Sequence, residues 1–341
     1  MELVPLRPPD SSLAPPPFGR VVTSEIDLSK SLDEKTLEAI DTALTQHGLL
    51  IFQGQRGLIP EMEWAFVSSL PWLDKEFSTS LKTSHVAWWQ FAECPMVRRL
   101  GDAVDDTGEP LALLNRIGYE WHTDGGGASY LYCERAPHSP RRTTLFASGA
   151  AAYEALPADR RIEAERIMVH YSVRFVTGDT AAVDYNAGAR MAPSGLRLAK
   201  ACTERGPEGH ATGKGAHARP LVRVHPLTSR KVLWASPKNM DHLEIGGRAL
   251  GVERSRATLE ELMQYGTATQ DTALVYEHQW KVGDVALMDN RQVLHSTTPY
   301  PNEHDNHGQQ LMHHISVKAR RPQPGWTEVG ALQIPGKAAG S

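Results

Sequence analysis

The feature that most limits how this chain can fold is a histidine and an aspartate that stand one residue apart. They lie in the stretch Glu120-Trp121-His122-Thr123-Asp124, which Gly125-Gly126-Gly127 follows. Side chains alternate along an extended strand, so His122 and Asp124 are expected to point to the same side. An imidazole and a carboxylate on one face make half of a metal site. A distant histidine would complete the two-histidine-one-carboxylate triad that suits non-haem Fe(II). A chain with 15 histidines also produces this spacing by chance, so a third ligand is needed.

The candidate third ligand follows an apolar segment near the C-terminal end. Val285 to Met288 has the character of a buried strand, and it leads into Asp289-Asn290-Arg291 and then to His295. We therefore take His295 as the histidine that completes the triad.

Composition excludes several classes of protein. The 341 residues can bury a large core, and 40% hydrophobic and 22% charged residues are ordinary for a globular chain. A net charge of −4 gives no footprint for nucleic acid. The mean hydropathy of −0.39 and the lack of a long apolar run predict no membrane span. The three cysteines form no metal-type pattern, so we expect reduced thiols and a cytoplasmic protein.

Hydrophobic periodicity predicts many short strands with a few helices between them. A helix is expected from Asp33-Glu34-Lys35 to Gly48, followed by a buried strand at 49–52. The further strands that we expect are at 23–28, 128–133, 142–146, 169–175, 220–226, 231–235, 276–280 and 285–288, and the further helices at 148–156, 159–168 and 258–265.

The organisation that we expect is one catalytic domain at 20–322, between a proline-rich arm at 1–19 and a tail at 323–341. Residues 177–219 are rich in glycine and poor in apolar periodicity. We interpret them as a lid or an insertion.

Several ordered motifs resemble the taurine dioxygenase (TauD/TfdA-like) family of non-haem Fe(II)/2-oxoglutarate oxygenases. They cover most of residues 20–322. They are His47-Gly48-Leu49-Leu50-Ile51-Phe52, Trp121-His122-Thr123-Asp124, Thr144-Leu145-Phe146-Ala147-Ser148 with Ala152-Tyr153-Glu154-Ala155-Leu156, Val224-His225-Pro226, and Gly283-Asp284 with Asp289-Asn290-Arg291 and His295. The resemblance implies a mainly β protein with flanking helices, built on a double-stranded β-helix (jelly-roll, cupin-like) core. The short strands read from periodicity agree with such a core.

The same resemblance implies the chemistry of the site. His122, Asp124 and His295 would bind Fe(II), leaving positions for 2-oxoglutarate and O₂. Thr144 matches the threonine that helps to hold the carboxylate of the cosubstrate. The implied reaction is the oxidation, most often hydroxylation, of a small molecule. Neither nucleic acid nor a membrane is an expected partner, and a homo-oligomer is compatible with the sequence.

One position departs from the family pattern. The family has an arginine in a Met-His-Arg motif that pairs with the distal carboxylate of 2-oxoglutarate, and this chain has His314 there. His314 is therefore a candidate contact of the cosubstrate, although histidine lacks the planar fork of arginine. Lys318 and Arg320 would share the strand face of His314, and Arg116 lies just before the metal motif. These three residues are the candidate replacements for the missing cation.

Other functions are compatible with parts of the pattern. An Fe(II)/O₂ oxygenase could dispense with 2-oxoglutarate or use another oxo acid. A non-catalytic partner subunit would not need an intact triad. A cupin-like binding protein would not need the motifs beyond the ligands. The leading hypothesis is thus the 2-oxoglutarate-dependent oxygenase, and succinate production distinguishes it from the first alternative.

Overall fold

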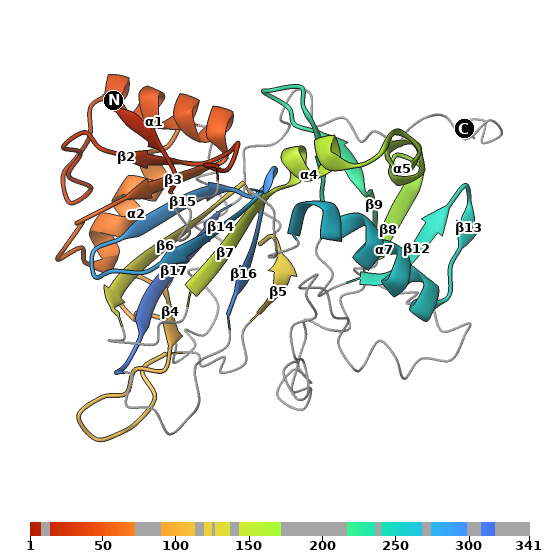
Figure 1. Cartoon of the computed structure of the whole chain (residues 1–341). Coiled ribbons are helices and arrows are strands. Elements are labelled where there is room, and N and C mark those ends of the chain that lie inside the picture. Colours follow the sequence, from red (N-terminus) through yellow and green to blue (C-terminus); the bar gives the residue numbers. More distant parts are fainter. Residues whose placement is uncertain are drawn as a thin grey trace, which may run out of the picture.

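Figure 1 shows a computed structural model of the chain. The structure describes residues 1–7, 14–71, 90–112, 119–124, 127–136, 143–171, 217–235, 240–267, 274–298 and 308–317. Among the helices of these ranges, none is both long and apolar enough to cross a membrane. Most of the segment predicted as a lid, and all of the tail at 323–341, lie outside the described residues.

Two β-sheets face each other and form the core. The larger has the strand order β1-β2-β3-β15-β6-β17-β4, and the smaller has the order β14-β7-β16-β5. Phe146 and Tyr276 of the smaller sheet pack in one buried cluster with Leu131, Met288 and Met312 of the larger. The strands are β1 Leu3–Pro5, β2 Arg20–Val22, β3 Leu49–Phe52, β4 Arg98–Gly101, β5 Tyr119–His122, β6 Ala128–Arg135, β7 Thr143–Ser148, β14 Val275–Gln279, β15 Val285–Asp289, β16 Val293–Thr297 and β17 Leu311–Val317.

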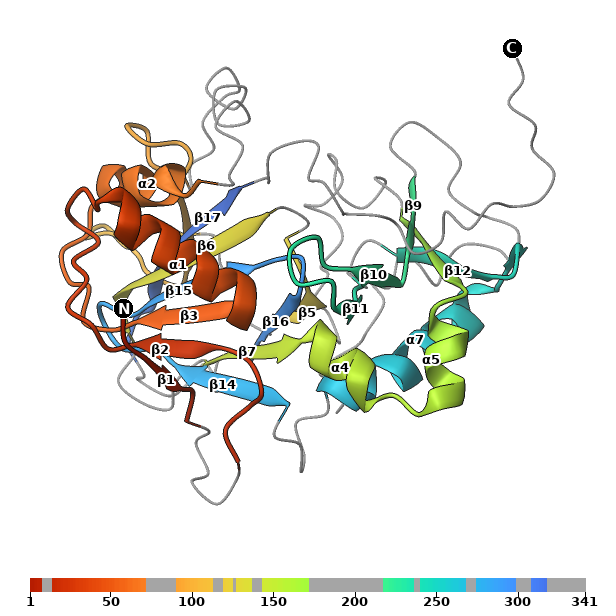
Figure 2. The ribbon, with the colours of Figure 1, turned by 90° about the horizontal axis from the view of Figure 1, so that it is seen from above.

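Two helices cover the outer face of the larger sheet. In α1 (Glu34–His47) the Asp33 carboxylate accepts the Thr36 backbone N–H at 2.7 Å, and the helix ends at Gly48 with φ 75°. α2 (Pro60–Ser69) lies beside it. Both helices lie over this face of the sheet (Figure 2), and their buried side chains form one cluster with side chains of its strands. The helix side chains include Ile40, Leu44, Phe66 and Val67. Burial of this face fixes the orientation of β17, whose opposite face looks into the space between the sheets.

A second layer covers the outer face of the smaller sheet. Trp121, Leu145 and Leu294 of that sheet share a buried cluster with residues of α7 and of a third sheet, ordered β13-β12-β8-β9. In α4 the Ser148 hydroxyl accepts the backbone N–H of Ala151, as expected of a helix cap. The elements of this layer are α4 Gly149–Ala155, α5 Ala158–Ala164, β8 Ile167–Tyr171, β9 His217–Pro220, the hairpin strands β10 Val222–Val224 and β11 Lys231–Leu233, β12 Met240–Ile245, β13 Arg248–Ala249 and α7 Val252–Thr267.

The structure confirms the predicted fold class: mixed β-sheets with flanking helices in the arrangement expected of a double-stranded β-helix. A few element boundaries were wrong. The first expected strand, 23–28, is β2 at Arg20–Val22, and it pairs with β1, so the start of the N-terminal arm belongs to the larger sheet. The helix expected at 159–168 ends at Ala164, because Ile167 already pairs in β8. Residues 217–219, expected at the end of the lid, belong to β9.

Candidate metal centre

The predicted triad comes together at the edge of the smaller sheet. β5 and β16 are antiparallel neighbours in which His122 and His295 are direct register partners. Asp124 follows two residues after His122, on the same side of the chain. Each residue offers one ligand atom, and these atoms all lie within 4.8 Å of one another. Among the described residues, this is the one group with such an arrangement.

The distances inside the triad suit a shared cation better than direct hydrogen bonds. His122 Nε2 lies 3.8 Å from Asp124 Oδ1, and His295 Nε2 lies 3.9 Å from Asp124 Oδ2. The two imidazole ring centroids are 4.1 Å apart. Ligand atoms that each lie about 2.0–2.2 Å from one metal ion are themselves about 3–4 Å apart. The three side chains therefore leave space for one ion between them.

The surroundings of Asp124 and His295 favour the protonation state that binds a metal. Burial alone would raise the pKa of the Asp124 carboxyl, but the His314 imidazole beside it holds that pKa well below its usual range. Burial, together with the neighbouring His122 imidazole, lowers the pKa of His295 to about 3. Asp124 is thus a carboxylate and His295 a neutral imidazole with a free lone pair, as metal binding requires.

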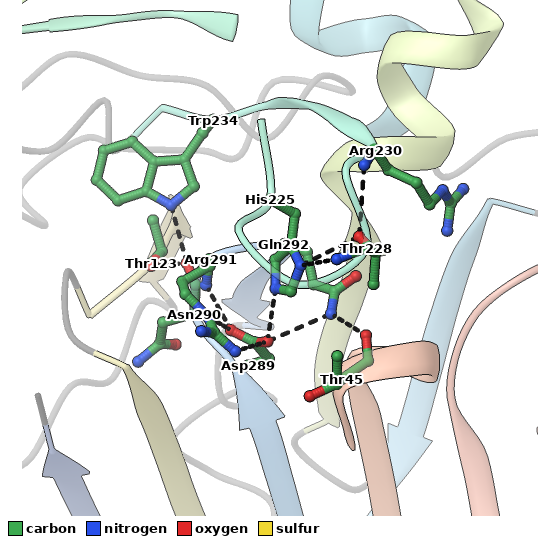
Figure 3. A network of polar contacts seen from close by, with 10 residues as sticks. All are labelled: Thr45, Thr123, His225, Thr228, Arg230, Trp234, Asp289, Asn290, Arg291 and Gln292. Atoms are coloured by element: carbon green, nitrogen blue, oxygen red, sulfur yellow. Dashed lines mark hydrogen bonds and ion pairs between the residues drawn. The ribbon is translucent and has the colours of Figure 1, made fainter. Parts of the chain in front are cut away.

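The turn between β15 and β16 places His295 through a buried polar network (Figure 3). The Asp289 carboxylate is fully buried, and it accepts hydrogen bonds from Arg291 Nε at 2.7 Å and Arg291 Nη2 at 2.6 Å. His225 Nε2 lies 3.0 Å from Asp289 Oδ2, and Gln292 Nε2 donates to the same oxygen at 3.3 Å. The motifs Val-His-Pro and Asp-Asn-Arg, far apart in the sequence, therefore meet in one network that fixes the start of β16.

Asn290 links that turn to the other two ligands. Its backbone carbonyl accepts the Thr123 hydroxyl at 3.0 Å and the Trp234 Nε1–H at 2.8 Å (Figure 3). Its backbone N–H donates to the Gly127 carbonyl at 3.1 Å. Thr123 stands between His122 and Asp124, and Gly127 follows the motif. These bonds therefore connect the middle of the His-x-Asp motif, and the segment after it, to the segment that carries His295.

Thr144 lies in the interior of the smaller sheet, on the face that carries His295. It is buried, and its register partner in β16 is Thr297, two residues beyond His295. Trp280 Nε1 donates to Thr144 Oγ1 at 2.9 Å. Indole N–H is only a donor, so the Thr144 oxygen must accept, and its own O–H is left to donate. This geometry is compatible with the predicted role of Thr144 toward a carboxylate.

His314 lies beside the candidate metal ligand Asp124. Its side chain is buried, and Nε2 is 3.1 Å from Asp124 Oδ2. This contact was not part of the sequence prediction, which gave His314 to the cosubstrate. The candidate replacement cations Arg116, Lys318 and Arg320 lie outside the described residues.

Comparison with known proteins agrees with the geometry. The profile described as "Taurine catabolism dioxygenase TauD, TfdA family" matches residues 9–314. The chain belongs to the TauD/TfdA family of alpha-ketoglutarate-dependent dioxygenases. The dioxygenase is 28% identical over 293 residues to the alpha-ketoglutarate-dependent 2,4-dichlorophenoxyacetate dioxygenase of Cupriavidus pinatubonensis, with 83% of this chain and 90% of the relative covered. It is 24% identical to pentalenolactone F synthase of Streptomyces avermitilis, with 82% and 85% covered.

Solved structures support the fold. A taurine dioxygenase from Burkholderia xenovorans superposes with a TM-score of 0.60 at 21% identity, covering 97% of this chain and 99% of that one. AAD-2, solved in complex with Mn(II) and N-oxalylglycine, gives a TM-score of 0.60 at 21% identity, covering 90% and 96%. At 21% identity, these two structures show that the fold is shared.

The donor set of this dioxygenase fits a ferrous ion. Two imidazole nitrogens and one carboxylate, on adjacent segments of one sheet, form the arrangement that leaves coordination positions open for other ligands.

The sequence did not indicate that the side chains of Ser129 and Asn290 take part in the surroundings of this site. The alternation of β6 could have indicated Ser129, since a small polar residue in an apolar inward-facing row is unusual. The bonds of Asn290 depend on tertiary contacts that no local pattern reports.

Proposed function

We propose that this dioxygenase binds Fe(II) through His122, Asp124 and His295, and uses 2-oxoglutarate and O₂ to oxidise a small organic molecule. The convergence of three ligand atoms within 4.8 Å carries the proposal. When bound there, Fe(II) supplies the chemistry that couples oxidative decarboxylation of 2-oxoglutarate to attack on the substrate.

The protein side chains have separate tasks in this reaction. Asp124 supplies the negative charge that balances a divalent cation, and the two histidines supply neutral donors. Thr144 donates its free O–H to the carboxylate of 2-oxoglutarate. The apolar residues between the sheets, such as Phe146, whose ring stacks against that of His295 at 6.4 Å between centroids, exclude water from the metal.

The names of the relatives guide the choice of substrates. They include dioxygenases of 2,4-dichlorophenoxyacetate, of (S)-phenoxypropionate and of sulfate esters, which are organic anions. We propose an organic anion as the first substrate class to screen. The expected partners are this substrate and O₂, without nucleic acid or a membrane, and a homo-oligomer is compatible with the fold.

We place the protein in a reducing compartment, the cytoplasm. Among the described residues, Cys94 is a free and buried thiol, which fits a reducing environment. Mass spectrometry of the purified protein without reductant tests this placement.

Succinate formation tests the proposed function. The protein is incubated with Fe(II), 2-oxoglutarate and the panel of anions, and O₂ uptake and succinate are measured together. We expect substrate-dependent succinate in a one-to-one ratio with O₂ consumed. Substrate oxidation without succinate would instead favour an oxygenase that does not use 2-oxoglutarate.

A further inference from the structure

Asp124 has two oxygens in different surroundings. Oδ2 accepts hydrogen bonds from Ser129 Oγ and from His314 Nε2, the latter at 3.1 Å. Oδ1 lies 3.8 Å from His122 Nε2, and Oδ2 also lies 3.9 Å from His295 Nε2; both distances are too long for a hydrogen bond. One oxygen is therefore engaged by the protein, and the other faces the first histidine of the triad.

Hydrogen-bond direction through Ser129 is fixed by its neighbours. An ionised carboxylate can only accept, so the one Ser129 O–H must donate to Asp124 Oδ2. Asn290 Nδ2 then donates to Ser129 Oγ at 2.9 Å. Both Ser129 and Asn290 are fully buried, so water does not compete for these bonds. The result is a directed chain from Asn290 through Ser129 to Asp124.

His314 closes this arrangement from the facing strand. On β17 it is the register partner of Leu131 in β6, and Ser316 is the partner of Ser129. Opposed residues of an antiparallel pair point to the same face, so His314 and Ser129 approach Asp124 from neighbouring strands of the larger sheet. The neutral imidazole with its proton on Nε2 is sufficient for this bond, so the arrangement does not require His314 to be charged.

We propose that His314 is a positioning residue for the metal ligand Asp124. Together with Ser129 it occupies Oδ2, and it thereby leaves Oδ1 as the single oxygen that binds the metal. The proposal rests on the proposed metal site. It gives the histidine that replaces the family arginine a different role, because the Nε2 atom that contacts Asp124 cannot at the same time bind a cosubstrate carboxylate.

Metal binding by the full-length protein tests the proposal. Mn(II) is titrated calorimetrically into wild-type protein and into H314L, H314Q and S129A, without 2-oxoglutarate. Partners that orient metal ligands typically contribute 10–100-fold to affinity, so we expect H314L and S129A to bind Mn(II) about 10–100-fold more weakly. H314Q keeps a side-chain N–H of similar reach, and it should recover most of the affinity.

H313Q is the matched control. His313 is the neighbouring buried histidine on the same strand, but it points to the opposite face, where it pairs with Glu63 and Glu134. We expect H313Q to lower the thermal stability and to leave the Mn(II) affinity unchanged. The absorption spectrum of bound Co(II), which reports ligand number and geometry, should change in H314L and not in H313Q.

The outcomes separate this inference from the proposed function. Wild-type protein that fails to bind Mn(II) would overturn the metal site and the inference with it. Wild-type binding with equal affinity in H314L would overturn only the role of His314. An H314L protein with unchanged Mn(II) affinity and a weakened affinity for 2-oxoglutarate would return His314 to the cosubstrate, and would also overturn the proposal.

Discussion

At the scale of single residues, Thr144 shows how one hydrogen bond can orient another. The indole N–H of Trp280 donates to the Thr144 oxygen. The hydroxyl hydrogen of Thr144 therefore points away from Trp280. The sequence indicated Thr144 by resemblance, but the partner Trp280 became visible only in the structure.

Replacing this hydroxyl should affect the cosubstrate selectively. Hydrogen bonds to charged groups contribute about 1.5–3 kcal/mol, so we expect T144V to raise the KM for 2-oxoglutarate by about 10-fold or more. T144S keeps the O–H and should stay close to wild type. Steady-state kinetics with varied 2-oxoglutarate measure this effect. Equal KM values in T144V and wild type would remove Thr144 from the cosubstrate site.

His313 makes a buried charged group on the other face of β17. Its Nδ1 lies 2.6 Å from Glu63 Oε1 and its Nε2 lies 2.8 Å from Glu134 Oε2. Carboxylates only accept, so both ring nitrogens must carry protons. Burial lowers the pKa of His313, but the hydrogen bonds to Glu134 and Glu63 outweigh it and raise that pKa to about 9. Burial raises the pKa of Glu63, and the hydrogen bond from the His313 imidazolium opposes this rise and favours the ionised carboxylate.

The stability of this group should depend on pH. The pKa of His313 in the folded protein lies above its unfolded value of 6.5. The stabilisation of the folded state by the protonated imidazole is therefore complete below pH 6.5 and is lost as the pH rises through about 9. We expect H313Q to lower the free energy of unfolding by about 3 kcal/mol at pH 6. The difference from wild type should shrink at high pH. Urea unfolding at several pH values measures the difference in free energy of unfolding between wild type and H313Q. A difference that stays constant with pH would contradict a protonated His313.

At the scale of elements, the sequence predicted what depends on local periodicity and capping. The helix that opens at Asp33 and stops at Gly48 and the strand Leu49–Phe52 are confirmed, as is the helix that follows Ser148. β12 was not predicted, because its polar residues give no clean alternation. The bulge between Met240 and His242 breaks its register with β8.

The triad itself was predictable because a strand fixes the direction of His122 and a motif marked His295. The environment of the triad was not. Whether His314 contacts a cosubstrate or a metal ligand depends on how β17 and β6 are registered across the larger sheet, and register is a tertiary property.

The β15–β16 turn should be the most sensitive element. In D289N the buried Arg291 guanidinium would lose its carboxylate partner, which typically costs about 3–5 kcal/mol. We expect such a loss in chemical unfolding, together with weaker Mn(II) binding, since His295 follows this turn.

A surface pair supplies the control for D289N. Arg230 Nη2 lies 2.9 Å from the carboxylate of the exposed Glu154, and such a pair contributes about 0.2–1 kcal/mol. E154Q should therefore be nearly neutral. A D289N protein as stable as E154Q would show that the turn network does not carry the stability assigned to it.

At the scale of the whole molecule, the metal centre depends on long-range assembly. β5 and β16 bring together His122 and His295 from distant parts of the sequence, and the larger sheet supplies Ser129 and His314 from the facing side. The two outer layers, one of helices and one of helices with the third sheet, bury the outer faces of both sheets, and the side chains around the metal centre converge in the space between the sheets.

A crystal structure of the protein with Mn(II) in place of Fe(II) tests the central claim most directly. Anomalous scattering locates the ion without reference to the protein side chains. We expect one peak about 2.0–2.2 Å from His122, from His295 and from Oδ1 of Asp124, with Oδ2 still bound by Ser129 and His314. A peak elsewhere, or an ion that lacks any one of these three ligands, would contradict the metal centre described for this dioxygenase.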